Sequence, residues 1–177
     1  MNTLHTSFYK TPYGELILGE YDRHLCLCDW RYRKMRTSID EHISKELDVE
    51  FVDKETTVLL EAKNQLSEYF FRGRKVFNLP LLFVGSTFRK KVWNALKKVP
   101  YGNTITYLEL SKRLGNENAI RAIASANGAN AIAIIVPCHR VIGSDGKLVG
   151  YAGGLEAKKK LLQLEGAMSV PNQLSLF

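Results

Sequence analysis

Two short helical segments joined by a glycine-containing turn constrain the fold of this chain more than any other feature. Thr106 and Glu109 fit the capping-box pattern that begins a helix, and Gly115 can end that helix. The next segment, "NAIRAIASANG", has helical spacing and is ended by Asn127 and Gly128. Two short helices with such a turn between them predict a helix-turn-helix motif.

The second helix of this pair has an unusual composition. Small residues occupy most of it, and Arg121 is its only charged residue. A helix that reads bases in the major groove carries polar side chains along one face, whereas a helix of small residues lets its backbone approach a narrow minor groove closely. One long cation could then reach into the base stack. On this segment alone, a buried packing helix is the slightly favoured interpretation.

The positive charge of the chain is concentrated in its second half. The formal net charge is +7, yet residues 1–85 carry 12 basic and 13 acidic side chains, against 13 basic and 5 acidic in residues 86–177. Such asymmetry is expected where one half of a protein neutralises the phosphates of a nucleic acid. A solvated basic surface would explain the charge equally well.

The segments before the motif predict a separate small domain. Residues 7–30, "SFYKTPYGELILGEYDRHLCLCDW", alternate apolar and polar residues and predict two or three short strands. The polar segment 31–47 is expected to be irregular, and "TTVLLEAKNQLSEYFFRG" to be a helix that Gly73 ends. Ser86 can cap a further helix that Pro100 ends, and "LEAKKKLLQLEG" predicts a closing helix. We therefore expect an α+β protein.

The three cysteines and the absence of long apolar runs narrow the cellular setting. An odd number of cysteines argues against a disulfide framework. Cys26 and Cys28 lack a second paired cluster that would complete a metal site, so packed thiols are the favoured interpretation. No run approaches the ~20 apolar residues that cross a bilayer, and "MNTLHTSFYK" lacks a secretory pattern. We expect a cytoplasmic, monomeric protein that does not enter membranes.

The third cysteine has a distinctive setting. In "IIVPCHRVIG", Cys138 follows an uncharged apolar run, expected to be a buried strand, and precedes His139. A thiol with a pKa of ~8.5 becomes a nucleophile only as thiolate, and an imidazole can take its proton. Because consecutive side chains rarely face each other, the proton would pass through a water, with a carboxylate behind the histidine. A structural cysteine beside a surface histidine explains the pair alone equally well.

Longer stretches around this cysteine resemble a known family. Over residues 86–166, "PYGNTITYLEL" and "RAIASANGANAIAIIVPCHRVIGSDGKLVGYAGGLEAKKKLLQLE" resemble the O6-alkylguanine-DNA alkyltransferases, also called methylated-DNA–protein-cysteine methyltransferases. The N-terminal half is similar mainly in "TPYGELILGE". The resemblance implies a ribonuclease-H-like α+β domain at 1–80, a mainly helical, winged-helix-like helix-turn-helix domain at 86–168, and a tail at 169–177.

The resemblance also implies an activity and its chemistry. The protein would flip an O6-alkylguanine out of double-stranded DNA and accept its alkyl group irreversibly on Cys138, once per molecule. His139 would be the water-bridged base, with Glu165 behind it. Tyr107 would lie near the extruded base, and Asn130 would hold the turn before the cysteine.

The DNA surface and the base pocket are implied in the same way. Arg121 would enter the stack in place of the flipped nucleotide. The other residues expected at the DNA are Tyr107, Ala122, Ser125 and Arg140. The residues expected to line the guanine pocket are Val149, Tyr151 and Ala152.

Departures from the family pattern are few. Ala131, Ala124 and Ala152 stand where proline, glycine and serine are usual, and the last of these removes a possible donor to O6. Some relatives hold zinc on the N-terminal domain, but this chain lacks the matching Cys and His set, so we predict no metal and no cofactor. A non-catalytic lesion-binding relative is the alternative, against which Cys138 argues. A Cys-His hydrolase would leave the arginine-bearing helix unexplained.

The last five residues form a separate motif. "QLSLF" resembles the short peptide by which bacterial repair and replication proteins dock onto the polymerase sliding clamp. Its glutamine and apolar anchors can fill a preformed pocket as the tail folds on binding. The residues concerned are Gln173, Leu174, Leu176 and Phe177. A tail packed on its own domain is the competing interpretation.

Overall fold

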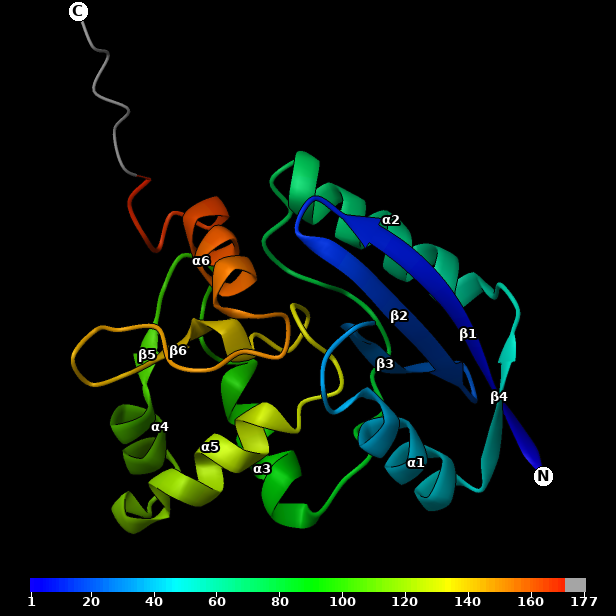
Figure 1. The fold of residues 1–177 in the computed structure, drawn as a ribbon, viewed down its shortest axis with the longest axis horizontal. Coiled ribbons are helices and arrows are strands. Elements are labelled where there is room, and N and C mark those ends of the chain that lie inside the picture. The colour runs from blue at the N-terminus through cyan, green and yellow to red at the C-terminus, as the bar shows by residue number, and fades with distance from the viewer. Residues whose placement is uncertain (171–177) are drawn as a thin grey trace, which may run out of the picture.

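The structure, a computed structural model, describes residues 1–170 and begins with a four-stranded sheet (Figure 1). The strands lie in the order β3-β2-β1-β4, with β1 antiparallel to β2 and parallel to β4. Turns at residues 12–13 and 22–23 separate the first three strands. The strand bounds are β1 (Asn2–Thr11), β2 (Gly14–Tyr21), β3 (His24–Trp30) and β4 (Val49–Asp53).

A helix covers each face of this sheet: α1 (Arg36–Leu47) and α2 (Thr57–Phe71). Because successive strand side chains point to opposite faces, Leu16 and Leu18 join the apolar cluster that contains α2, while Ile17 joins the cluster that contains α1. The strands expected from the sequence are therefore confirmed, but β2 is buried on both faces instead of alternating between apolar and polar residues.

The prediction that residues 31–47 are irregular is wrong, since α1 fills most of this segment. The helix is polar on most of its circumference, which hides its period. Ile39 and Ile43, one turn apart, are buried against the sheet at 7% and 1% exposure. Two apolar residues one turn apart suffice to bind the helix to the sheet, because the sheet supplies the apolar surface on which they pack.

The second half of the chain opens with helices whose ends were predicted. Ser86 accepts a hydrogen bond from Arg89 N at the start of the first, and Thr106 and Glu109 form a reciprocal capping box at the start of the second. The elements are α3 (Thr87–Leu96), α4 (Tyr107–Arg113), the short 3₁₀ turn η1 (Glu117–Ala119) and α5 (Ile120–Gly128). Helices α4 and α5 make the expected helix-turn-helix (Figure 1).

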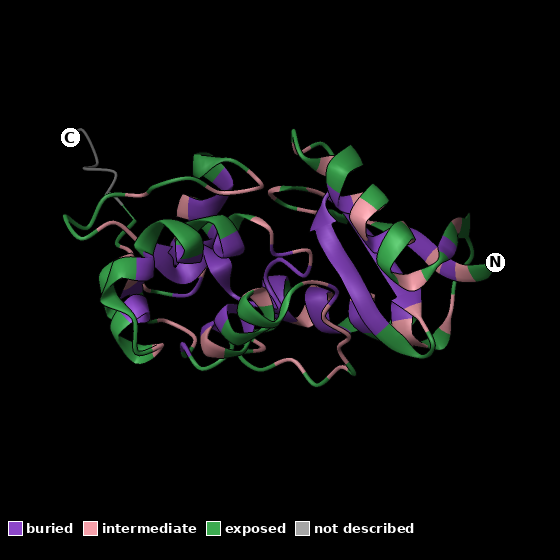
Figure 2. Cartoon of the chain, turned by 90° about the horizontal axis from the view of Figure 1, so that it is seen from below, coloured by how far each residue is buried: buried purple, intermediate pink, exposed green. Residues whose placement is uncertain are grey.

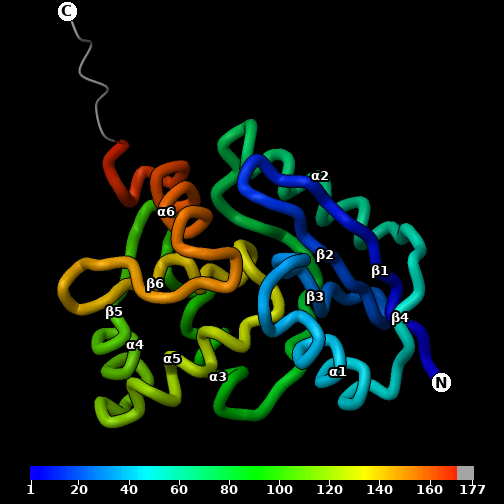
Figure 3. Tube along the Cα trace, viewed as in Figure 1, coloured from blue at the N-terminus to red at the C-terminus, as the bar shows by residue number. Residues whose placement is uncertain are grey.

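The chain then returns to the junction between its two halves. In Figure 3 the segment after α5, drawn in yellow, runs from that helix to the edge strand β3 and on to β6. Strand β6 pairs in parallel with β5. The remaining elements are β5 (Ile105–Thr106), the 3₁₀ turn η2 (Cys138–Arg140), β6 (Val141–Ile142) and α6 (Leu155–Leu164).

The buried strand expected just before the cysteine is not present, because the segment folds into tight turns. Asn130 causes this: its amide donates to the carbonyls of Ile132 and Val136, and its oxygen accepts from Ile132 N. Only Ile132 pairs with a strand, as a single bridge to Cys28 on the free edge of β3. The apolar run reflects burial at the junction between the two halves.

One apolar core extends across that junction. It joins sheet residues such as Leu16 and Trp30 to Trp93 of α3 and to the turns around Ile134. In Figure 2 the buried residues lie in the sheet and on the inward sides of the helices, while exposed residues cover the outside. The two halves are thus packed as one body over a common apolar contact. Within residues 1–170, no helix is long and apolar enough to cross a membrane.

Candidate active site

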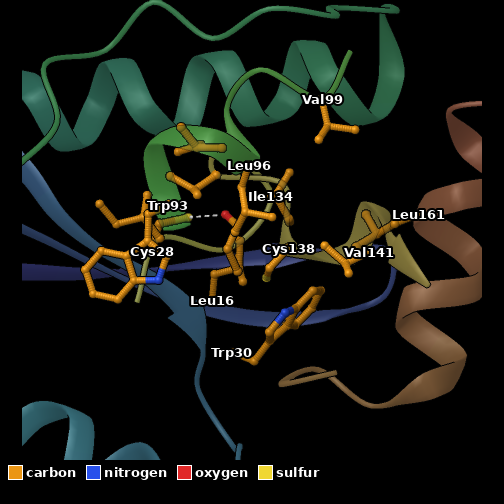
Figure 4. Packing of buried hydrophobic residues seen from close by; sticks show 14 of the residues in the cluster. Leu16, Cys28, Trp30, Trp93, Leu96, Val99, Ile134, Cys138, Val141 and Leu161 are labelled. Carbon is orange, nitrogen blue, oxygen red and sulfur yellow. Dashed lines mark hydrogen bonds between the residues drawn. The ribbon is translucent and has the colours of Figure 1, made fainter. Parts of the chain in front are cut away.

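Cys138 begins the turn η2 and lies at a cavity of about 660 Å³ between the two halves of the molecule. Its side chain is nearly buried, at 3% exposure, and packs near Ile134, Val141 and Trp30 (Figure 4). Helices α4 and α5 line one side of the cavity through Tyr107, Ala124, Asn127 and Gly128. The N-terminal half lines another side through Tyr13, Gly14, Glu15, Trp30 and residues 32–35.

His139 and Glu165 form a buried pair behind the cysteine. His139 Nε2 lies 2.7 Å from Glu165 Oε1, and both side chains are 0% exposed. Glu165 is the residue that ends α6. The other ring nitrogen, Nδ1, is buried and has no hydrogen-bond partner among the described residues. The pair therefore orients the imidazole and leaves Nδ1 to accept a proton, which is the arrangement that a general base requires.

Arg140 belongs to this buried network, so its predicted place at the DNA is wrong. Its guanidinium donates from Nε to Glu165 Oε2 (2.9 Å) and from one Nη to Oε1 (3.0 Å). The other Nη donates to the carbonyl of Val99 at 2.6 Å. All its donor groups point inward and the residue is only 6% exposed. Arg140 balances the buried charge of Glu165 instead of meeting phosphates.

The protonation states at the site follow from burial and from this network. Burial alone would raise the pKa of Glu165, but hydrogen bonds from His139 and Arg140 overcome it and lower that pKa to about 2. Burial lowers the pKa of His139, with Glu165 opposing. Because Glu165 is ionised, His139 donates from Nε2 and is neutral at neutral pH.

The cysteine itself is a neutral thiol in this resting arrangement. Burial raises the pKa of Cys138, and a hydrogen bond with Asn130 and the cations of Lys158 and Arg33 only partly oppose that effect. The proton must leave when the reaction begins, toward the vacant lone pair of His139 Nδ1.

Tyr107 lines the cavity, and Asn130 lies in the turn that precedes the cysteine. Tyr107 begins α4, lines the cavity, and accepts a 3.5 Å hydrogen bond from Asn127, which also donates to the carbonyl of Cys138. Burial raises the pKa of Tyr107, so its hydroxyl keeps its proton. Asn130 holds the turn that carries the cysteine, through the three hydrogen bonds given above.

The exposed face of α5 carries the small residues. Arg121, Ala122 and Ser125 are exposed, while Ile123 and Ala126 pack inward. The interpretation of α5 as a helix buried on all sides is therefore excluded. No described residue pairs with the guanidinium of Arg121, in contrast to Arg140.

The pocket residues predicted from the sequence divide in two. Tyr151 and Ala152 line the cavity. Val149 does not: its side chain is 49% exposed, and its backbone carbonyl is what the site uses, as an acceptor for buried Lys158. The Lys158 ammonium donates hydrogen bonds to three backbone carbonyls, those of Val141, Val149 and Gly150. Because the Val149 carbonyl points inward to this ammonium, the Val149 side chain points outward.

Several contributors to the site were missed from the sequence. Tyr69 of α2 donates to Glu165, and Arg33 donates to the carbonyls of Gly128 and Asn130. Trp30 packs edge-to-face on Tyr151 at 5.9 Å. The helical spacing had placed Tyr69 among core residues, and no local pattern distinguishes a core tyrosine whose hydroxyl reaches a carboxylate 96 positions away. The predicted clamp peptide, residues 173–177, lies outside the described residues.

The fold and the site define a two-domain protein with a cysteine, histidine and glutamate at a cavity beside a helix-turn-helix. Two family models match it: the ribonuclease-like domain of 6-O-methylguanine DNA methyltransferase over residues 4–83, and the DNA binding domain of the same protein over residues 87–167. The chain therefore belongs to the 6-O-methylguanine DNA methyltransferase family.

Individual relatives agree with this membership. The chain is 42% identical to the methylated-DNA–protein-cysteine methyltransferase of Methanosarcina acetivorans, over 93% of this chain and 99% of the relative. It is 41% identical to the constitutive enzyme of Bacillus subtilis, over 88% and 92%. Among solved structures, it superposes on Mycobacterium tuberculosis OGT in complex with DNA with a TM-score of 0.77 and 36% identity, covering 93% of each chain.

Proposed function

We propose that this protein repairs DNA by direct reversal, moving an alkyl group, normally methyl, from O6 of guanine in double-stranded DNA to its own Cys138. The observation that carries this proposal is the position of Cys138 at a base-sized cavity with the buried His139–Glu165 pair behind it. The relatives of this chain are named for the same reaction. A non-catalytic lesion-binding role would leave this thiol and its base without a purpose.

The reaction balances with the groups present. The thiol proton passes through a water to His139 Nδ1, and Glu165 stabilises the imidazolium that forms. The sulfur attacks the alkyl carbon, so a C–S bond forms as the O6–C bond breaks. The departing guanine takes up a proton, which Tyr107 delivers and then regains from His139. The product is a thioether that no group in the site can cleave, so each molecule acts once.

The target base must leave the helix before the sulfur can reach it. We propose that α5 enters the minor groove with its exposed small residues and that Arg121 fills the gap left by the flipped nucleotide. Unstacking costs a few kcal/mol, part of which the inserted cation offsets. Ala122 and Ser125 would lie against the groove, and the basic second half would neutralise phosphates.

Labelled DNA tests the proposal. Duplex DNA carrying methyl-labelled O6-methylguanine in molar excess over the protein is incubated with it, and label on protein is counted. We expect transfer of at most one methyl group per molecule, abolished in Cys138→Ala while DNA binding is kept. Several turnovers per molecule, or tight lesion binding without any label on the protein, would contradict it.

We propose in addition that the protein acts as a monomer in the cytoplasm, with the domain division given above, and that the tail docks onto the polymerase sliding clamp. The reaction needs a reduced thiol, which suits a reducing compartment. Clamp binding would use Gln173, Leu174, Leu176 and Phe177. Deleting residues 173–177 should abolish binding to purified clamp and leave methyl transfer to a short duplex unchanged; equal clamp affinity with and without the tail excludes the docking.

A further inference from the structure

We propose that Tyr69, a residue of the N-terminal domain, is a positioning residue for alkyl transfer: its hydroxyl binds the Glu165 oxygen that orients His139, and so limits how strongly His139 holds a proton. The proposal rests on the proposed function for its effect on the reaction. The effect on His139 itself can be measured without DNA.

Three donors converge on one carboxylate oxygen. Tyr69 Oη donates to Glu165 Oε1 at 2.6 Å, the shortest of the three contacts. His139 Nε2 and an Arg140 Nη lie 2.7 and 3.0 Å from the same atom. Within residues 1–170, the second oxygen, Oε2, accepts only from Arg140 Nε. Tyr69 and His139 therefore share the same oxygen, and the strength of one hydrogen bond depends on the other.

The position of the Tyr69 hydroxyl is fixed by packing. The side chain is 1% exposed. Its ring meets Phe70 edge-on at 5.1 Å and Tyr101 edge-on at 6.1 Å, and Phe77 lies tilted against it at 5.5 Å. Burial and the neighbouring carboxylate raise the pKa of Tyr69 well above its usual value, so the hydroxyl always donates. A rigid, permanently protonated donor is suited to holding a carboxylate in place.

The consequence for His139 follows from the charges around the pair. The imidazole is faced by the Glu165 anion and by the cations of Arg140 and Lys158. Glu165 is faced by His139, Arg140, Tyr69 and, at longer range, Tyr101. Each donor on Oε1 withdraws negative charge that would otherwise stabilise an imidazolium. Removing the Tyr69 hydroxyl should therefore raise the affinity of His139 for a proton.

The N-terminal domain is on this account part of the catalytic apparatus. The site that Cys138, His139 and Glu165 form in the second half of the chain is incomplete without a hydroxyl from α2. The effect is to keep the resting imidazole neutral, so that it is ready to accept the thiol proton.

The test is an NMR titration of the His139 imidazole nitrogens in the full chain without DNA, for wild type, Tyr69→Phe and Tyr101→Phe. Tyr101 is the matched control, because its hydroxyl donates at 3.3 Å to the Leu164 carbonyl next to Glu165 but not to the carboxylate. We expect Tyr69→Phe to raise the pKa of His139 by about one unit, since hydrogen bonds to charged groups are worth about one to two units and the imidazole feels part of that. Tyr101→Phe should leave it unchanged.

The reaction supplies the second readout. The acid limb of the methyl-transfer rate should move to higher pH in Tyr69→Phe by the same shift. Should that variant fail to fold, 3-fluorotyrosine at position 69, a stronger donor of nearly the same shape, should lower the pKa of His139. An unchanged His139 pKa with either substitution overturns the inference, even if the rate falls. Failure of wild type to take up methyl would instead overturn the proposed function.

Discussion

Two arginines of this protein, both expected at the DNA from sequence, lie in opposite environments. Arg121 lies on the exposed face of α5 with no described partner, while Arg140 is buried and all its donor groups are bound within the protein. The two arginines therefore have different roles. We expect the first region to meet the nucleic acid with an exposed cation, whereas the second uses a buried cation to keep a carboxylate ionised near Cys138.

The largest effect is expected from Arg140→Ala. Removing this guanidinium leaves the Glu165 anion buried without its bidentate partner, which should lower the free energy of unfolding by about 3–5 kcal/mol. Urea denaturation monitored by tryptophan fluorescence measures the loss. A change in the free energy of unfolding below about 0.5 kcal/mol would show that Arg140 contributes no more to stability than an exposed arginine such as Arg121.

Arg121→Ala should leave the free energy of unfolding unchanged and slow repair. Losing the cation that offsets part of the unstacking cost, about 1–2 kcal/mol, should lower the rate of transfer from duplex DNA about tenfold. Transfer from free O6-methylguanine base, which needs no unstacking, should be unchanged. Single-turnover assays on both substrates decide this, with Arg72→Ala as an exposed arginine control on the N-terminal domain.

The small residues of α5 predict a smaller effect of the same kind. Ser125→Leu places bulk on the exposed face and should weaken binding to duplex DNA several-fold, by about 1 kcal/mol, because the helix backbone can no longer approach the groove closely. Ser125→Ala keeps the face small and should bind as wild type does. Equal affinities for all three proteins, measured by fluorescence anisotropy, would show that α5 does not lie in the groove.

The buried region should also make stability depend on pH, whereas the α5 face should not. The native pKa of His139 lies below its unfolded value of about 6.5, so as pH falls through 6.5 the unfolded chain binds a proton that native His139 refuses. Unfolding is thereby favoured at pH 5 relative to pH 7. His139→Gln should reduce this difference, and His24→Gln, at an exposed position, should not; equal pH dependence in both variants would contradict the assignment.

How far the sequence could be read depended on whether the relevant interactions were local. The caps at Ser86 and Thr106 and the strands within residues 7–30 were predicted because each depends on neighbours a few residues away. Helix α1 was missed because two isoleucines carry its burial. A strand was wrongly predicted before Cys138 because the side chain of Asn130 overrides the apolar pattern.

The site shows the same limit. The resemblance identified Cys138, His139 and Glu165, and the structure joins the last two by a hydrogen bond of 2.7 Å. It did not distinguish Arg140 from a surface cation, and it missed Tyr69 and Lys158. Each of these acts through a contact with a distant segment, and residue type alone does not show whether a polar head group points outward or inward.

The central claim is that the buried sulfur beside His139 takes the alkyl group from DNA. The most direct measurement is the intact mass of the protein after exposure to duplex DNA with one O6-methylguanine, followed by peptide mapping. The account predicts that each reacted molecule gains a single methyl in place of a hydrogen, on the peptide containing Cys138. An unchanged mass after the lesion has been bound, or a methyl found on Cys26 or Cys28, would contradict it.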